Sequence, residues 1–194
     1  MGWLRWLLSR KDVLTLAVVV VGGVAVVLLS IQIQRAIFDN FKFGQSSNSI
    51  YIATFSYDHG LYEDSLQELA KAYDIASTIN DQNKRLELYG YILIYKGSCE
   101  IQLARYHYSE VNIVRANKYS NEALATINPE SFPILYVGAL FNLATAHHVR
   151  FINYGEQSDR EASIRFYKEV INYLPKEDYL HRQASDRIDR LEGN

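Results

Sequence analysis

The stretch GLYEDSLQELAKA, residues 60–72, decides the fold. It opens with Gly60, which suits a tight turn. An aromatic residue, Tyr62, follows, and the small residues Ser65 and Ala72 come after it at helical spacing. Seven residues are close to two turns of an α-helix, so these two small side chains lie on one face. The stretch therefore predicts a helix that a second helix can approach closely.

The rest of the chain after residue 45 extends this interpretation. It has no strand-like alternation of apolar and polar residues and instead reads as successive amphipathic helices. The expected breaks fall at Gly44, Gly60, Asn80, Asp81, Pro129, Pro133, Gly155 and Pro175. The sequence thus predicts an all-α fold.

The helices after residue 82 repeat. When the chain is aligned with itself after a shift of 47 residues, small residues meet small ones, aromatic residues meet aromatic ones and aliphatic residues meet aliphatic ones. The pairs include Tyr89 and Tyr136, Leu93 and Leu140, Gly97 and Ala144, Ala116 and Ser163, Tyr119 and Phe166, and Ala123 and Val170. The match spans two helices, so the repeating unit is a helical hairpin.

The pattern of small residues resembles that of the tetratricopeptide repeat family, whose antiparallel helices pack through small residues at fixed places. The matching positions are Ala53, Ser65 and Ala72 in the first unit, Gly97, Ala116 and Ala123 in the second, and Ala144, Ser163 and Val170 in the third. The resemblance implies a short α-solenoid of about three helical hairpins over residues 46–176. We expect residues 177–194 to form a capping helix that covers the last apolar edge.

The spacing departs from the family in the second and third units. From first to last small position the first unit spans 19 residues, whereas the other two span 26. Seven extra residues are two helical turns. Both helices of those hairpins are therefore expected to be about one turn longer than usual.

An apolar segment precedes the repeats. No charged residue occurs over residues 13–34, and fourteen of the residues from Val13 to Ile33 are Val, Leu or Ile. About 20 apolar residues suffice for a transmembrane helix. The alternative, a cleaved signal peptide, has a shorter apolar core and small residues at its cleavage site. Residues 13–34 are therefore predicted to cross the lipid bilayer as a single-pass transmembrane helix.

The flanking residues suggest an orientation. Residues 1–12 carry Arg5, Arg10 and Lys11 and would form an interfacial segment, whereas Arg35 and Lys42 lie on the other side, in a stalk over residues 35–45. The positive-inside rule then favours a cytoplasmic N-terminus and a translocated C-terminal domain in the periplasm or a lumen. The membrane is expected to be a bacterial inner membrane or an organelle membrane.

The sequence contains few residues that are arranged for catalysis or for binding a metal or cofactor. The net charge of −2 argues against a nucleic-acid partner, and no phosphate loop, dinucleotide-binding motif or nucleophile motif is present. His147 and His148 are adjacent, so on a helix they point about 100° apart and cannot bind one metal together. The single cysteine, Cys99, lies in an apolar helix and is interpreted as a small core residue. We therefore expect no enzyme activity, no cofactor and no metal site.

The resemblance also implies a binding groove, lined by the first helix of each hairpin. Carried over residue by residue, its positions are Ile50, Thr54, Tyr57, Ile94, Ser98, Ile101, Phe141, Thr145 and His148. None of them carries a formal charge, which favours an apolar or helical segment of a partner protein. Residues 176–194 or a neighbouring repeat would alternatively cover some of these positions.

Three functions fit this picture. The first is a membrane-anchored adaptor or assembly factor for a membrane protein complex, whose subunits would be its partners. The second is a constitutive structural subunit of such a complex, and the third is a receptor for extended or amphipathic segments. A homo-oligomer is also compatible with the sequence.

Overall fold

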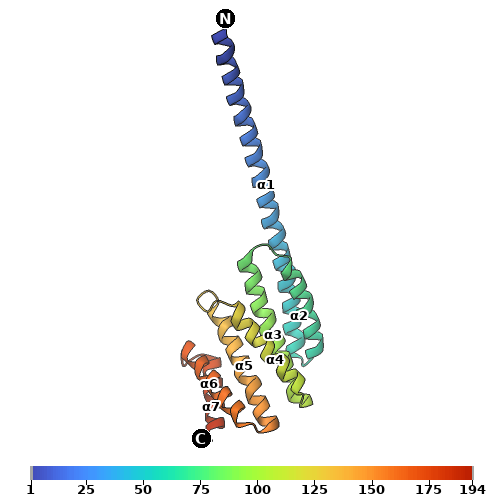
Figure 1. Cartoon of the computed structure of the whole chain (residues 1–194). Coiled ribbons are helices and arrows are strands. Elements are labelled where there is room, and N and C mark those ends of the chain that lie inside the picture. The colour runs from blue at the N-terminus through green and yellow to red at the C-terminus, as the bar shows by residue number, and fades with distance from the viewer. Residues whose placement is uncertain (1, 194) are drawn as a thin grey trace. The chain divides into compact units, whose positions relative to one another are not determined.

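The computed structural model describes the backbone of residues 2–193 and the side chains of residues 21 and 23–193. Over that range the chain is all-helical, with seven helices and no strand, which confirms the all-α part of the prediction (Figure 1). The helices are α1 (Gly2–Asp58), α2 (Tyr62–Ser77), α3 (Gln82–His107), α4 (Glu110–Thr126), α5 (Pro133–Tyr154), α6 (Gln157–Tyr173) and α7 (Tyr179–Glu192). They form two compact units, residues 1–41 and 42–194.

The first unit is the apolar part of α1. By length and composition, the described part of this helix is long and apolar enough to cross a membrane. Those of its side chains that the structure describes are largely exposed, and Val21 and Val26 are 68% and 67% accessible. The side chains of the predicted interfacial segment, residues 1–12, and of the first part of the predicted span lie outside the described residues.

Two predicted helix boundaries need correction. The break expected at Gly44 is wrong, because α1 continues through it to Asp58. A single glycine costs a helix only about 1 kcal/mol relative to alanine, which the surrounding helical hydrogen bonds outweigh. In contrast, the sequence interpretation missed the break between α3 and α4, where Tyr108 adopts a left-handed backbone with φ of 51°. Ser109 then caps α4 by accepting a hydrogen bond from the Asn112 amide at 3.4 Å.

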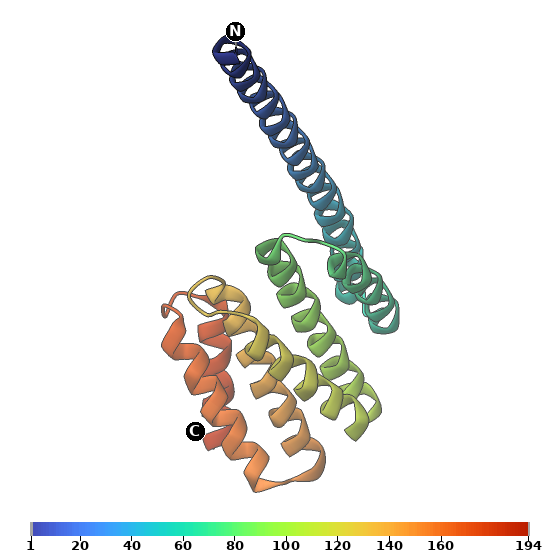
Figure 2. The same cartoon turned by 45° about the horizontal axis from the view of Figure 1, so that its top comes forward.

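The second unit is held together by helices that cross at small residues. Helices that follow one another from α2 to α7 pack in pairs, and α3 also packs against α5 (Figures 1 and 2). All nine small positions of the repeat pattern are buried. The reason is clearest at Gly97, where an added Cβ would lie 3.2 Å from Nδ2 of Asn142 and 3.3 Å from Oγ of Ser120. A side chain at this crossing has almost no room.

The helix lengths place the extra residues of the longer units. Helix α3 has 26 residues and α5 has 22, whereas α4 and α6 have 17 each, against 16 in α2. Past the small residue of the first helix, α3 and α5 each continue for ten residues, whereas α1 continues for five after Ala53. Before the first small residue of the second helix, α4 and α6 each have six residues, whereas α2 has three before Ser65. The additional residues therefore lie in both helices of each longer hairpin, about one turn in each, as expected. Longer first helices provide a longer wall on the face that they share.

Helix α7 packs against the last hairpin. Its buried residues Ala184, Ile188 and Leu191 join a cluster that contains Tyr167 and Val170 of α6. Asp178 caps the helix by accepting a hydrogen bond from the Leu180 amide at 2.7 Å. The chain from residue 176 onward thus returns to the preceding hairpins.

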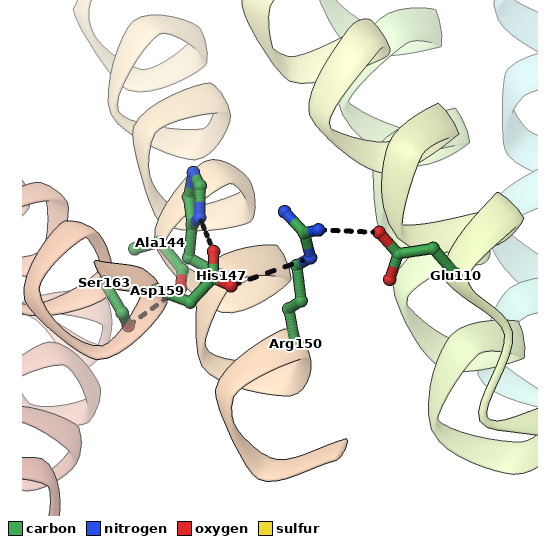
Figure 3. A network of polar contacts seen from close by, with 6 residues as sticks. All are labelled: Glu110, Ala144, His147, Arg150, Asp159 and Ser163. Atoms are coloured by element: carbon green, nitrogen blue, oxygen red, sulfur yellow. Dashed lines mark hydrogen bonds and ion pairs between the residues drawn. The ribbon is translucent and has the colours of Figure 1, made fainter. Parts of the chain in front are cut away.

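A polar network around the buried Asp159 links three helices (Figure 3). Nδ1 of His147 donates to Oδ1 of Asp159 at 2.7 Å, and Arg150 lies 3.6 Å from the other oxygen of that carboxylate. Arg150 also pairs with Glu110 of α4 at 3.0 Å. Helix α6 begins at Gln157 with Glu156 as its N-cap and no side-chain cap hydrogen bond, and the buried carboxylate of Asp159 in its first turn faces α5.

Candidate partner-binding groove

A cavity of about 580 Å³ lies between α3, α5, α7 and the end of α1. Helices α3 and α5 provide its two long walls, α7 provides a third, and Tyr57 and Asp58 lie at one end. The residues that line it are Tyr57, Asp58, Ile94, Tyr95, Ser98, Ile101, Gln102, Arg105, Gly138, Phe141, Asn142, Thr145, Tyr179, Leu180, Gln183 and Arg187. We call this cavity the groove.

The groove brings together six of the nine residues predicted from the sequence. They are Tyr57, Ile94, Ser98, Ile101, Phe141 and Thr145. His148 lines a neighbouring cavity of about 480 Å³, and Ile50 lines a smaller one of about 280 Å³. Thr54 lines none of these cavities, and its hydroxyl donates to the Ile50 carbonyl one turn earlier at 2.9 Å. The predicted line of first-helix residues is therefore continuous in α3 and α5 but not along α1.

Aromatic and aliphatic side chains form much of the groove wall. Tyr57 packs edge-on against Tyr95, with ring centroids 6.2 Å apart, and its hydroxyl accepts a hydrogen bond from Nε2 of Gln102 at 3.1 Å. Burial raises the pKa of Tyr57, so its hydroxyl stays protonated at neutral pH. Ile94 and Phe141 face the same space from α3 and α5. This wall suits apolar side chains of a ligand.

Asn142 fixes α3 and α5 relative to each other. Its Nδ2 donates to the Ile94 carbonyl at 2.7 Å, and its Oδ1 accepts from the Ser98 hydroxyl at 3.1 Å. The side chain is buried, so both bonds are shielded from water. The spacing between the two long walls is therefore set by a specific polar contact as well as by packing.

Helix α7 contributes a wall that the sequence interpretation missed. Nη1 of Arg187 donates to the hydroxyls of Thr145 at 2.8 Å and Tyr167 at 2.7 Å. The guanidinium group also lies 4.9 Å from the centre of the Phe141 ring. Residues 176–194 therefore do not simply cover the groove, since α7 becomes part of its lining.

The groove is not uncharged. Arg105, Arg187 and Asp58 line it, so the expectation of a lining without formal charge is wrong. The two arginines come from positions outside the set that the resemblance supplied. Arg105 was accessible to sequence reasoning, because it continues the spacing of Ile94, Ser98 and Ile101 by one more turn of α3. Arg187 could not be identified from the spacing of residues along one helix, since its position in the groove depends on how α7 packs.

The other singled-out residue, Cys99, lies in the core. Its thiol is fully buried and donates to the Ser65 hydroxyl at 3.3 Å. Burial raises the pKa of Cys99 to about 11, so the reactive thiolate is scarce at neutral pH. Within the residues whose side chains are described, no group of three His, Cys, Asp or Glu side chains is placed to hold a metal ion.

No family model, curated protein or solved structure matches this chain.

Proposed function

We propose that this protein is a single-pass membrane protein whose tetratricopeptide-like hairpins bind a segment of a partner protein in the groove, as an adaptor or assembly factor. The observation that carries the proposal is the groove itself. Its volume of about 580 Å³ and its apolar walls from α3 and α5 suit a few side chains of an inserted segment. The groove has none of the paired catalytic groups that would favour an enzyme.

The exposed apolar side chains of α1 support a membrane anchor. Residues such as Val24, Leu28 and Leu29 are more than half exposed, and no other part of the described chain covers them. A continuous apolar surface of this kind is unfavourable in water and favourable in hydrocarbon. The cytoplasmic N-terminus and the translocated helical domain follow from the flanking charges.

A second candidate, a constitutive subunit of a membrane complex, is favoured by a separate surface. The turns that follow α3 and end α5 expose Tyr106, Tyr108 and Ile152, and the Tyr154 hydroxyl donates to the Tyr108 carbonyl at 3.0 Å. This hydrogen bond places the two turns side by side. Exposed apolar residues from neighbouring turns are typical of a contact surface.

The test uses the full chain with a C-terminal tag, extracted from its native membrane in a mild detergent. Tyr179→Glu is the principal variant, because Tyr179 lines the groove yet is 65% exposed, so the substitution does not disturb the core. Tyr51→Glu is the matched control, since Tyr51 is 70% exposed and lines no described cavity. We expect Tyr179→Glu and Phe141→Glu to reduce the captured partner at least tenfold and Tyr51→Glu to leave it unchanged.

Two results separate the alternatives. A partner that stays bound to folded Tyr179→Glu and Phe141→Glu would exclude the groove as the binding site. Fixed stoichiometry and resistance to salt washing would favour the constitutive subunit over the adaptor. Protection of the C-terminal domain from protease in right-side-out vesicles would contradict the proposed orientation and favour the receptor.

A further inference from the structure

A second cavity, of about 480 Å³, adjoins the groove. Arg105 and Arg187 line both cavities and so lie between them. Arg190, His148 and Ile152 are among the other residues of this second cavity, which we call the arginine cavity. Its arginines come from α3 and α7, which lie far apart in the sequence, and His148 comes from α5.

The three arginines of this cavity are not paired with an acidic side chain of the described part of the chain. Among the residues with described side chains, no carboxylate lies within 4.0 Å of Arg105, Arg187 or Arg190. The same chain pairs Arg115 with Glu100 and Arg150 with Asp159. Three guanidinium groups that converge without a counter-charge repel one another, and a bound anion relieves that repulsion.

This excess of positive charge lowers the pKa values of two groups that line the cavity. The pKa of Arg105 is lowered, first by burial and then by the charge of Arg187. The pKa of His148 is lowered to about 4, by burial and by the charges of Arg187, Arg105 and Arg190. Tyr167, from α6, faces the His148 ring edge-on, with ring centroids 6.2 Å apart.

Arg187 is held in place before any ligand arrives. Its Nη1 donates to Thr145 and Tyr167, and its guanidinium plane lies 4.9 Å from the Phe141 ring centre. An arginine fixed in this way loses little conformational entropy when it binds an anion. In addition, Nδ1 of His148 is buried without a hydrogen-bond partner.

We propose that the arginine cavity binds the phosphate group of a small organic phosphate monoester. A phosphate dianion carries two negative charges and three terminal oxygens, which matches three guanidinium groups better than a carboxylate does. The cavity is larger than a phosphate ion, and Val149, Ile152 and Tyr108 provide apolar lining for an attached organic group. The proposal does not depend on partner binding in the groove.

The experiment follows His148 by NMR. The full chain, labelled with ¹³C in its histidine rings, is placed in an uncharged maltoside detergent without phosphate buffer, and the His148 signal is assigned as the one missing in His148→Gln. The His148 signal is then followed at about pH 7.5, where phenyl phosphate is a dianion, during titration with phenyl phosphate, citrate or sodium chloride at matched ionic strength. We expect phenyl phosphate to shift the His148 signal in a saturable way, since the bound anion offsets the arginine charges that surround the ring.

Two variants of α7 identify the site. Arg190→Gln removes one cavity arginine that is exposed and outside the core, and we expect it to weaken phenyl phosphate binding about tenfold. Arg182→Gln is the matched control, because Arg182 is an exposed arginine of the same helix that lines neither cavity, and its effect should stay below about twofold.

Three outcomes would overturn the proposal. Equal shifts with sodium chloride and phenyl phosphate would mean that salt only screens the arginines. An equal loss of affinity in Arg182→Gln and Arg190→Gln would mean diffuse attraction to the helix surface. Tighter binding of citrate than of phenyl phosphate would reassign the cavity to polycarboxylates.

Discussion

Gly97 offers the sharpest test of the packing described above. Replacing it by alanine adds one methyl group at the place where α3 crosses its neighbours. The new Cβ would lie 3.2 Å from Nδ2 of Asn142, 3.3 Å from Oγ of Ser120 and 3.7 Å from the Ala116 carbonyl. Both of the nearest groups are hydrogen-bonded, Asn142 to the Ile94 carbonyl at 2.7 Å and Ser120 to the Ala116 carbonyl at 2.9 Å. They cannot move away without stretching those bonds.

Two opposing effects set the magnitude. Alanine is better than glycine inside a helix by about 1 kcal/mol, because glycine loses more backbone entropy on folding. Overpacking a tight contact costs about 1–3 kcal/mol. We expect Gly97→Ala to lower the free energy of unfolding by about 1 kcal/mol, since the displaced groups also lose part of their hydrogen bonding.

Gly138→Ala is the matched control, because Gly138 lies inside α5 and gains the same helix propensity. Its added Cβ would first meet the Ile94 side chain at 3.4 Å, which is ordinary van der Waals contact. This variant should therefore be more stable than the wild type by about 0.5–1 kcal/mol. The two variants should differ by about 4–8 °C in unfolding midpoint, measured by far-UV circular dichroism on the full chain in detergent. A Gly97→Ala protein as stable as Gly138→Ala would refute the tight crossing.

Three other substitutions test local features. Burial raises the pKa of Glu100 above its value in the unfolded chain, so the ionised carboxylate destabilises the fold at high pH. This destabilisation disappears as the pH falls through the raised pKa. In denaturation curves, Glu100→Gln should therefore be more stable than the wild type at pH 8, and the difference should shrink toward pH 4.5. Asp159→Asn removes the charge that His147 and Arg150 contact and should lower the free energy of unfolding by about 1–3 kcal/mol, whereas an unchanged midpoint would mean that the network contributes nothing to stability. Tyr108→Gly relieves a left-handed backbone and should raise the unfolding free energy by up to about 1 kcal/mol; a less stable variant would mean that the exposed ring contributes more than the backbone strain costs.

Local signals were sufficient to predict most of the fold. Small residues at fixed spacing identified the helix crossings, because only small side chains fit between close helices. The breaks predicted at Gly60 and Pro133 coincide with observed helix boundaries. The glycine rule failed at Gly44, where no turn interrupts the helix. The break at Tyr108 was missed because neither glycine nor proline is present there, although Ser109 before Glu110 is a recognisable start signal for α4.

The groove was only partly predictable for a different reason. Ile94, Ser98 and Phe141 were predicted from the family resemblance, which implies that the first helix of each hairpin lines the groove. The contribution of α7 depends on where the last helix packs, and its Arg187 contacts Thr145 across 42 positions of sequence. No local pattern encodes a contact at that range, so the presence of Arg187 in the groove could be recognised only from the tertiary arrangement.

The burial of Cys99 makes the natural chain a background without reactive thiols for labelling. It is the single cysteine of the 194 residues, it is inaccessible, and with a pKa of about 11 roughly one thiol in 10⁴ is ionised at pH 7. A cysteine placed at an exposed position such as Glu130, between α4 and α5, would thus be the dominant target of a membrane-impermeant maleimide. The side of the membrane on which the helical domain lies can therefore be read from one substitution in the otherwise unaltered protein.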